Sequence, residues 1–120
     1  TGAETASERF RRLFKTIVKA SVELFFRERK LYDVAAFSAS ERWQSAVLYE
    51  LEIQQIIKQI VLEGRESGEF ERKTPLDEVV TAVYLVMSPY LNPLSLKYNL
   101  DRADDAAVQL SNLVLRSLAP

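Results

Sequence analysis

The sequence predicts an all-α protein, an antiparallel helical bundle of about five to six helices. Apolar residues recur at helical spacing along four long segments. Each segment opens with a pattern typical of a helix N-terminus, and no segment alternates polar and apolar residues as a half-buried strand would. The 120 residues have room for one hydrophobic core, so we expect a single domain over residues 1–120.

The predicted helix starts share the spacing of a capping box. In this motif a Ser, Thr or Asp side chain caps a backbone N–H, and an acidic side chain three residues later returns the bond. The spacing occurs at four pairs: Thr5 and Glu8, Ser38 and Glu41, Thr74 and Asp77, and Asp101 and Asp104. Pro75 follows the third cap, and proline suits the first helical position.

The helices expected from these starts differ in length. Long helices are expected at about 8–29, 41–67, 76–91 and 102–118, with a short separate helix within 30–37. Pro89 and Pro93 interrupt the hydrogen-bond ladder, so residues 88–99 are expected to form a loop or a broken helix.

The stretch VLEGRESGEF at 61–70 raises the question of how the 41–67 helix ends. Gly68 suits the left-handed position that follows a helix, and Phe70 is placed to fold back on the last turn. Gly64 lies inside the predicted helix, where glycine costs about 1 kcal/mol relative to alanine. A close helix crossing would explain Gly64; the other interpretation is that the helix stops there.

The composition excludes several functional classes. The chain has no His and no Cys, which removes the commonest general base, the commonest metal ligand and every disulfide or thiolate zinc site. With three glycines, no phosphate-binding loop can be formed. We therefore expect no enzyme, no cofactor and no metal. No apolar run is long enough for a membrane span, so no membrane partner is expected.

The residues EGRESGEF at 63–70, followed by a polar loop and an apolar helix, resemble the ligand-binding half of TetR-family transcriptional repressors. The segments LDEVVTAVYLVMSPYL (76–91) and DDAAVQLSNLVLRSL (104–118) resemble the two C-terminal helices that pair in the family's dimer. The similarity covers most of residues 8–118. It implies a bacterial, cytoplasmic regulator that contacts DNA through an N-terminal helix-turn-helix module, which this chain does not contain.

Polar residues inside the apolar arc of the 41–67 helix are the first candidates for a binding site. Glu50 and Gln54 lie in the middle of that arc, where a buried carboxylate or amide needs a partner. They either face a ligand cavity or form a satisfied core pair, for example Glu50 with an Arg or a Tyr hydroxyl. The resemblance places the pocket between these helices and adds aromatic walls. The candidate ligand-binding set is Phe14, Trp43, Glu50, Gln54 and Tyr84.

The 76–91 helix is apolar nearly all round, so it must be covered on more than one side. A partner subunit is one cover, and two such helices from each of two chains would form a two-fold four-helix interface. The other interpretation is a central helix in a monomer. The candidate homodimer interface comprises Val79, Val83, Val86, Tyr90, Ala106, Leu110, Leu113 and Val114.

These observations lead to one expected function and one alternative. The expected function is that of an effector-binding and dimerisation domain of a TetR-like repressor. It would sense a small, mostly apolar ligand and couple it to DNA binding by the missing N-terminal module. The alternative is a helical protein–protein interaction module without a small-molecule site.

Overall fold

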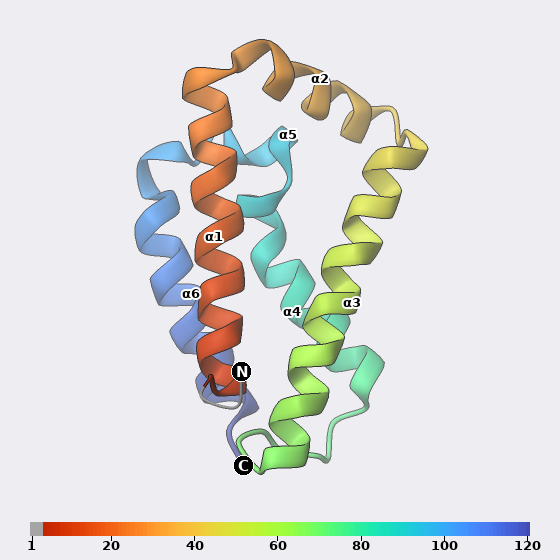
Figure 1. Ribbon diagram of the computed structural model, residues 1–120, viewed down its shortest axis with the longest axis vertical. Helices are drawn as coiled ribbons and strands as arrows, with labels where there is room; N and C mark the ends of the chain where they lie inside the picture. Colours follow the sequence, from red (N-terminus) through yellow and green to blue (C-terminus); the bar gives the residue numbers. More distant parts are fainter. Residues whose placement is uncertain (1–3) are drawn as a thin grey trace.

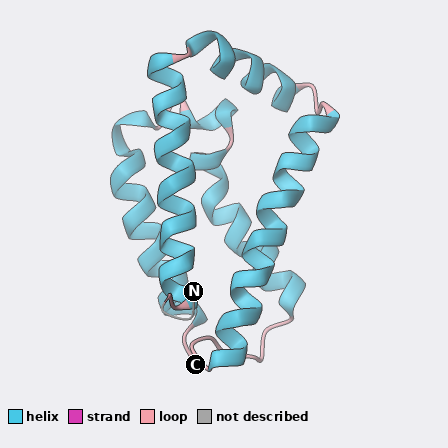
Figure 2. Cartoon of the chain, in the orientation of Figure 1, coloured by secondary structure: helices cyan, strands magenta, loops and turns pink. Residues whose placement is uncertain are grey.

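The computed structural model describes residues 4–120 as a bundle of helices joined by short loops (Figures 1 and 2). The elements are α1 (Ala6–Arg27), α2 (Arg29–Ser40), α3 (Gln44–Ser67), α4 (Leu76–Leu91), α5 (Pro93–Leu96), a 3-10 turn (Leu100–Arg102) and α6 (Ala103–Leu118). The predicted all-α class is confirmed. The bounds of α4 agree with the sequence prediction, and the ends of α1, α3 and α6 lie within three residues of it.

The long helices alternate in direction, with α1 and α4 running one way and α3 and α6 the other (Figure 1). Helix α1 packs against α6 and α3, and α3 packs against α4. At one end of the bundle, α2 spans the gap between α1 and α3, with α5 packed beneath it (Figure 1). This arrangement leaves α2 as a roof over the space between α1, α3 and α4.

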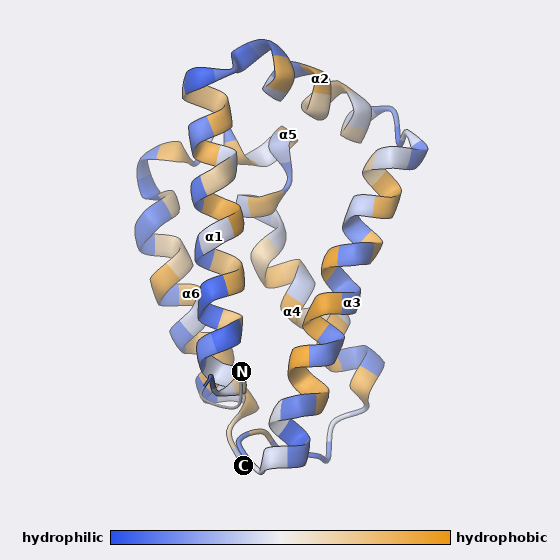
Figure 3. Cartoon of the chain, viewed as in Figure 1, coloured by the Kyte–Doolittle hydropathy of each residue, from blue (hydrophilic) through white to orange (hydrophobic). Residues whose placement is uncertain are grey.

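Apolar side chains from all four long helices form one core. Hydrophobic and hydrophilic residues alternate along α1 and α3 at helical spacing (Figure 3), because one stripe of each helix faces its neighbours. Core residues that are at most 3% exposed are Phe10, Phe14, Val18, Tyr32, Ile53, Ile57, Ile60, Val61, Phe70, Met87, Leu91, Leu96 and Ala103. No helix within residues 4–120 combines the length and apolarity that crossing a membrane requires.

The capping box predicted at the start of α1 is confirmed. The Glu8 N–H donates to the Thr5 hydroxyl at 3.1 Å, and the Thr5 N–H donates to the Glu8 carboxylate at 3.3 Å. The α1 N-terminus has a second anionic partner, because Glu69 from the α3–α4 loop accepts bonds from the N–H groups of Ala6 and Ser7.

The other three predicted caps are wrong. Ser38 lies inside α2, and its hydroxyl donates back to the Ala35 carbonyl at 2.8 Å instead of capping α3. Pro75, with no side chain to accept a bond, stands at the N-cap of α4 instead of Thr74. Asp101 belongs to the 3-10 turn that precedes α6. The spacing alone does not identify a cap, since the same residues also occur within helices and turns.

The end of α3 confirms the predicted role of Gly68, whose φ of +88° places it in the left-handed region. The Phe70 N–H donates to the Gly64 carbonyl at 3.0 Å, which brings the Phe70 ring back over the last turns of the helix. Gly64 lies within α3, so the helix does not stop there. The space that a side chain at position 64 would occupy is taken by the Phe70 ring, so Gly64 makes room for that ring and not for a crossing helix.

Candidate functional site

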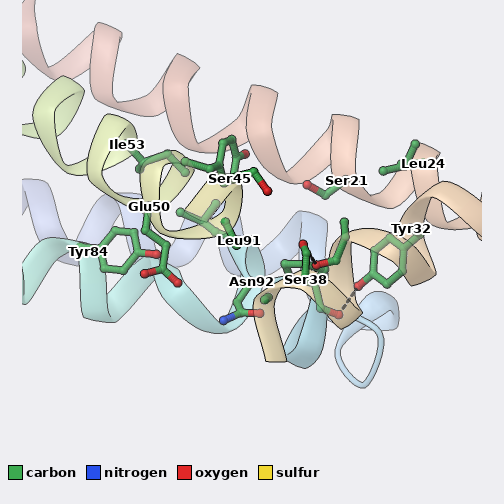
Figure 4. Close-up of a pocket in the computed structure, with 15 residues that line it drawn as sticks. Ser21, Leu24, Tyr32, Ser38, Ser45, Glu50, Ile53, Tyr84, Leu91 and Asn92 are labelled. Atoms are coloured by element: carbon green, nitrogen blue, oxygen red, sulfur yellow. Dashed lines mark hydrogen bonds between the residues drawn. The ribbon is translucent and has the colours of Figure 1, made fainter. Parts of the chain in front are cut away.

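A cavity of about 310 Å³ lies beneath α2, at the end of the bundle where α1 and α3 diverge (Figure 4). Five helices, α1 to α5, contribute to its wall. The lining residues are Ser21, Leu24, Tyr32, Ala35, Ser38, Ala39, Ser45, Ala46, Tyr49, Glu50, Ile53, Tyr84, Leu91, Asn92 and Pro93. The wall is therefore mostly apolar with a few polar groups, which is the usual character of small-molecule sites.

Small side chains account for the empty space. Where α2 meets α3, the side chains facing the cavity are those of Ala35, Ala39, Ser45 and Ala46. Because alanine and serine side chains are short, they do not fill the space between the two helices, and a cavity remains. The stretch AAFSAS at 35–40 carried this signal in the sequence.

A hydrogen bond from Tyr32 connects α2 to α5 in the wall of the cavity. The Tyr32 side chain is 1% exposed, and its hydroxyl donates to the Pro93 carbonyl at 2.6 Å, joining α2 to α5 (Figure 4). Burial raises the pKa of Tyr32, so the hydroxyl stays neutral and keeps its proton for this bond.

Two further tyrosines present hydroxyl groups from α3 and α4. Burial raises the pKa of Tyr84, and the nearby Glu50 carboxylate raises it further. Burial likewise raises the pKa of Tyr49, with a smaller contribution from Glu52. Both phenols are therefore neutral near pH 7 and can donate or accept a hydrogen bond.

Glu50 lies in the cavity wall beside Tyr84 (Figure 4), and its side chain is 23% exposed. One guanidinium nitrogen, Nη1 of Arg42, donates to both carboxylate oxygens of Glu50 at 3.0 and 3.1 Å. The Arg42 side chain is 60% exposed, so the pair stands at the edge of the cavity next to solvent. Glu50 thus lines the cavity and is paired with an arginine at the same time.

The remaining sequence candidates lie away from this wall. Gln54, one turn beyond Glu50, is half-buried and is not among the lining residues. Phe14 is fully buried in the core, where its ring packs edge-on against Phe10. Trp43 precedes α3, is 47% exposed and packs edge-on against Phe37. The structure therefore brings Glu50 and Tyr84 together and leaves the other three outside the cavity.

A second depression, a groove of about 410 Å³, runs between α4 and α6. Five of the predicted interface residues line it, namely Val79, Val83, Val86, Leu113 and Val114. Tyr90, Ala106 and Leu110 lie on the same two helices but outside the groove. Among residues 4–120 no group of three or more acidic side chains is placed to hold a metal ion.

The fold and the cavity define an all-α domain with a mostly apolar cavity between its helices. The sequence profile of the family described as "Tetracyclin repressor-like, C-terminal domain" matches residues 6–110. The chain belongs to this family. Comparisons with curated proteins and with solved structures return no match.

Proposed function

We propose that this chain is the effector-binding and dimerisation domain of a TetR-like transcriptional repressor. The observation that carries the proposal is the cavity beneath α2, whose apolar wall is interrupted by a single carboxylate, the Asn92 amide and the hydroxyl groups of three serines and three tyrosines. Such a site fits a small, mostly apolar molecule that is oriented by a few polar contacts.

The cavity wall includes the helix best placed to pass on a signal. Ser21 and Leu24 of α1 face the cavity, so a ligand that fills it contacts α1 directly. A ligand that binds one arrangement of α1 and α3 more tightly than another shifts the population toward that arrangement. In the full regulator, α1 would carry this shift to a DNA-binding module at its N-terminal end.

The groove between α4 and α6 supports the dimerisation part of the proposal. Its lining is mostly valine and leucine, with Glu71 and Glu78 also present. Leu113 in this lining is 54% exposed, and Leu85, also on α4, is 64% exposed. An exposed apolar surface formed by two adjacent helices suits a two-fold, self-complementary contact with a second copy of the chain.

Thermal unfolding in the presence of small amphipathic compounds tests the ligand-binding part. At least one compound should raise the melting temperature of the wild-type chain, because binding to the folded state alone stabilises it. The same compound should have no effect on Ala46→Phe, whose new ring occupies the cavity. Ala20→Phe, at an exposed position of α1 outside the cavity, is the matched control and should respond like the wild type.

Two outcomes would count against this function. Equal stabilisation of the wild-type and Ala46→Phe chains would show that the compounds bind elsewhere. A broad screen in which no compound raises the melting temperature would favour the alternative, a helical interaction module without a small-molecule site.

A further inference from the structure

We propose that the cavity selects an amphiphilic cation, with an apolar body and one ammonium group, and that this group takes the place of Arg42 at Glu50. The inference rests on the proposed function and names the ligand class of the same cavity. Among the described residues that line the cavity, Glu50 alone is charged.

The surroundings of Glu50 favour a positive group over a neutral or negative one. The carboxylate stands beside Tyr84 and follows Tyr49 on α3, so a bound ammonium would meet a negative charge, phenol oxygens and aromatic rings (Figure 4). A charge-assisted bond to a carboxylate and contact with aromatic faces both favour a cation. An anionic ligand would face repulsion from the same carboxylate.

The apolar residues of the wall would contact the apolar body of the ligand. Leu24, Ile53, Leu91 and the alanines of α2 supply apolar lining in the same cavity. Burial of an apolar body against them adds affinity in proportion to the area removed from water. The cavity thus combines one charged group with apolar lining, which matches an amphiphile that carries a single cationic group.

Arg42 is bound loosely enough to be replaced. One of its nitrogens serves both Glu50 oxygens, and the side chain is 60% exposed, so the guanidinium regains water readily when it leaves. Ion pairs this exposed contribute little to stability. A ligand cation held inside the cavity is more shielded from solvent, so its attraction to the same carboxylate is stronger.

The position of Arg42 gives the exchange a structural consequence. Arg42 lies in the turn between α2 and α3 and has a φ of +53°, which residues other than glycine rarely adopt. Its side chain spans from this turn to Glu50, more than two helical turns away in sequence. Replacement of Arg42 by the ligand therefore releases the α2–α3 corner from α3.

Three compounds with one skeleton and different charges test the inference: 4-phenylbutylamine, 4-phenylbutanol and 4-phenylbutyrate. Calorimetric titration of the wild-type chain at pH 7 should give the tightest binding for the amine and the weakest for the carboxylate. Glu50→Gln should weaken the amine about ten-fold and remove its advantage over the alcohol. Glu52→Gln, an exposed carboxylate on the same helix outside the wall, should leave the order unchanged.

Arg42→Gln distinguishes exchange from a fixed ion pair. Because the variant frees the carboxylate, it should bind the amine several-fold more tightly and the alcohol as the wild type does. Arg102→Gln is the matched control for loss of an exposed positive charge. Equal binding of amine and alcohol by the wild type, or weaker amine binding by Arg42→Gln, would overturn the inference while leaving the cavity as an effector site. Failure of all three compounds to bind would contradict the inference, whereas the proposed function would be contradicted only if the broad thermal screen also found no stabilising compound.

Discussion

The ring of Phe70 lies against the backbone of Gly64, in the space that a side chain at position 64 would occupy. Phe70 is 3% exposed and its N–H is bonded to the Gly64 carbonyl, so the ring cannot move aside without disturbing the core. Gly64 and Phe70 therefore pack as a pair at the end of α3. The absence of a side chain at Gly64 leaves room for the Phe70 ring against the last turns of the helix.

Gly64→Ala should destabilise the fold by about 1–3 kcal/mol, because the overpacking outweighs the gain in helix propensity. The measurement is urea unfolding followed by circular dichroism. In a Phe70→Ala background the ring is absent, so the same substitution should be neutral or stabilising by up to about 1 kcal/mol. A similar loss of stability in both backgrounds would contradict the assigned contact.

Glu69 connects the end of α3 to the start of α1. Its carboxylate accepts the N–H of Ala6 at 3.0 Å and that of Ser7 at 3.3 Å, where the partial positive charge of a helix N-terminus favours an anion. Burial acts to raise the pKa of Glu69, but these N–H donors and the Ser67 hydroxyl outweigh it and lower the pKa below its usual 4.5.

Glu69→Ala should cost about 1 kcal/mol at pH 7, a typical value for a lost helix cap. Because the folded-state pKa is lowered, the contribution is fully present above the unfolded-state pKa and is lost as the pH falls through the folded-state pKa. Urea unfolding of both chains between pH 7 and pH 3 should show the difference shrinking on acidification. Glu23→Ala, an exposed acid on α1, should show no such trend. A pH-independent difference for Glu69 would contradict this assignment.

Tyr32→Phe should destabilise the fold by about 1–2 kcal/mol, since it removes the bond to the partly buried Pro93 carbonyl and leaves that oxygen without its partner. Because the folded-state pKa of Tyr32 is raised, the hydroxyl's contribution is present below the unfolded-state pKa and is lost as the pH rises above about 10. Thermal unfolding at pH 7 and pH 11 measures both effects. Equal stability of the two chains at pH 7 would show that the bond does not hold α2 to α5.

Leu113→Glu should convert the proposed dimer into a monomer, because it places a charge against the valine side chains that line the groove between α4 and α6. Sedimentation equilibrium at micromolar concentration is the direct measurement. Val108→Glu is the matched control, since Val108 is equally exposed on α6 but does not line the groove. A wild-type chain that sediments as a monomer, or a dimer that tolerates Leu113→Glu, would contradict the proposed interface.

The sequence predicted the helices well because their signal is repeated along each one. In α4, the period of Val79, Val83 and Met87 persists over several turns, so a single ambiguous residue does not change the prediction. The helix starts were less predictable, because a cap depends on the local path of the backbone. Ser38 has the residue type and spacing of a cap, yet α2 continues past it to Ser40.

The cavity was predictable in part. Glu50 and Tyr84 could be found from polar or aromatic residues on inward-facing stripes, but Gln54 shares that stripe and lies outside the wall. Which turn of α3 lines the cavity depends on where α1 and α3 diverge. The point of divergence is set by tertiary packing, which the helical period of the sequence does not specify. The contributions of Tyr32 and Asn92 come from α2 and the α4–α5 junction, whose positions the helical period does not specify.

The most direct test of the account is to map a bound amphiphile on the chain by NMR. During titration with 4-phenylbutylamine, the backbone amide resonances that shift should cluster around the cavity, at Ser21, Ser38, Ala46, Glu50 and Tyr84. Resonances of the α4–α6 groove around Leu113 should stay in place. Shifts confined to that groove, or no saturable shift anywhere, would contradict the claim that the space beneath α2 is the effector site.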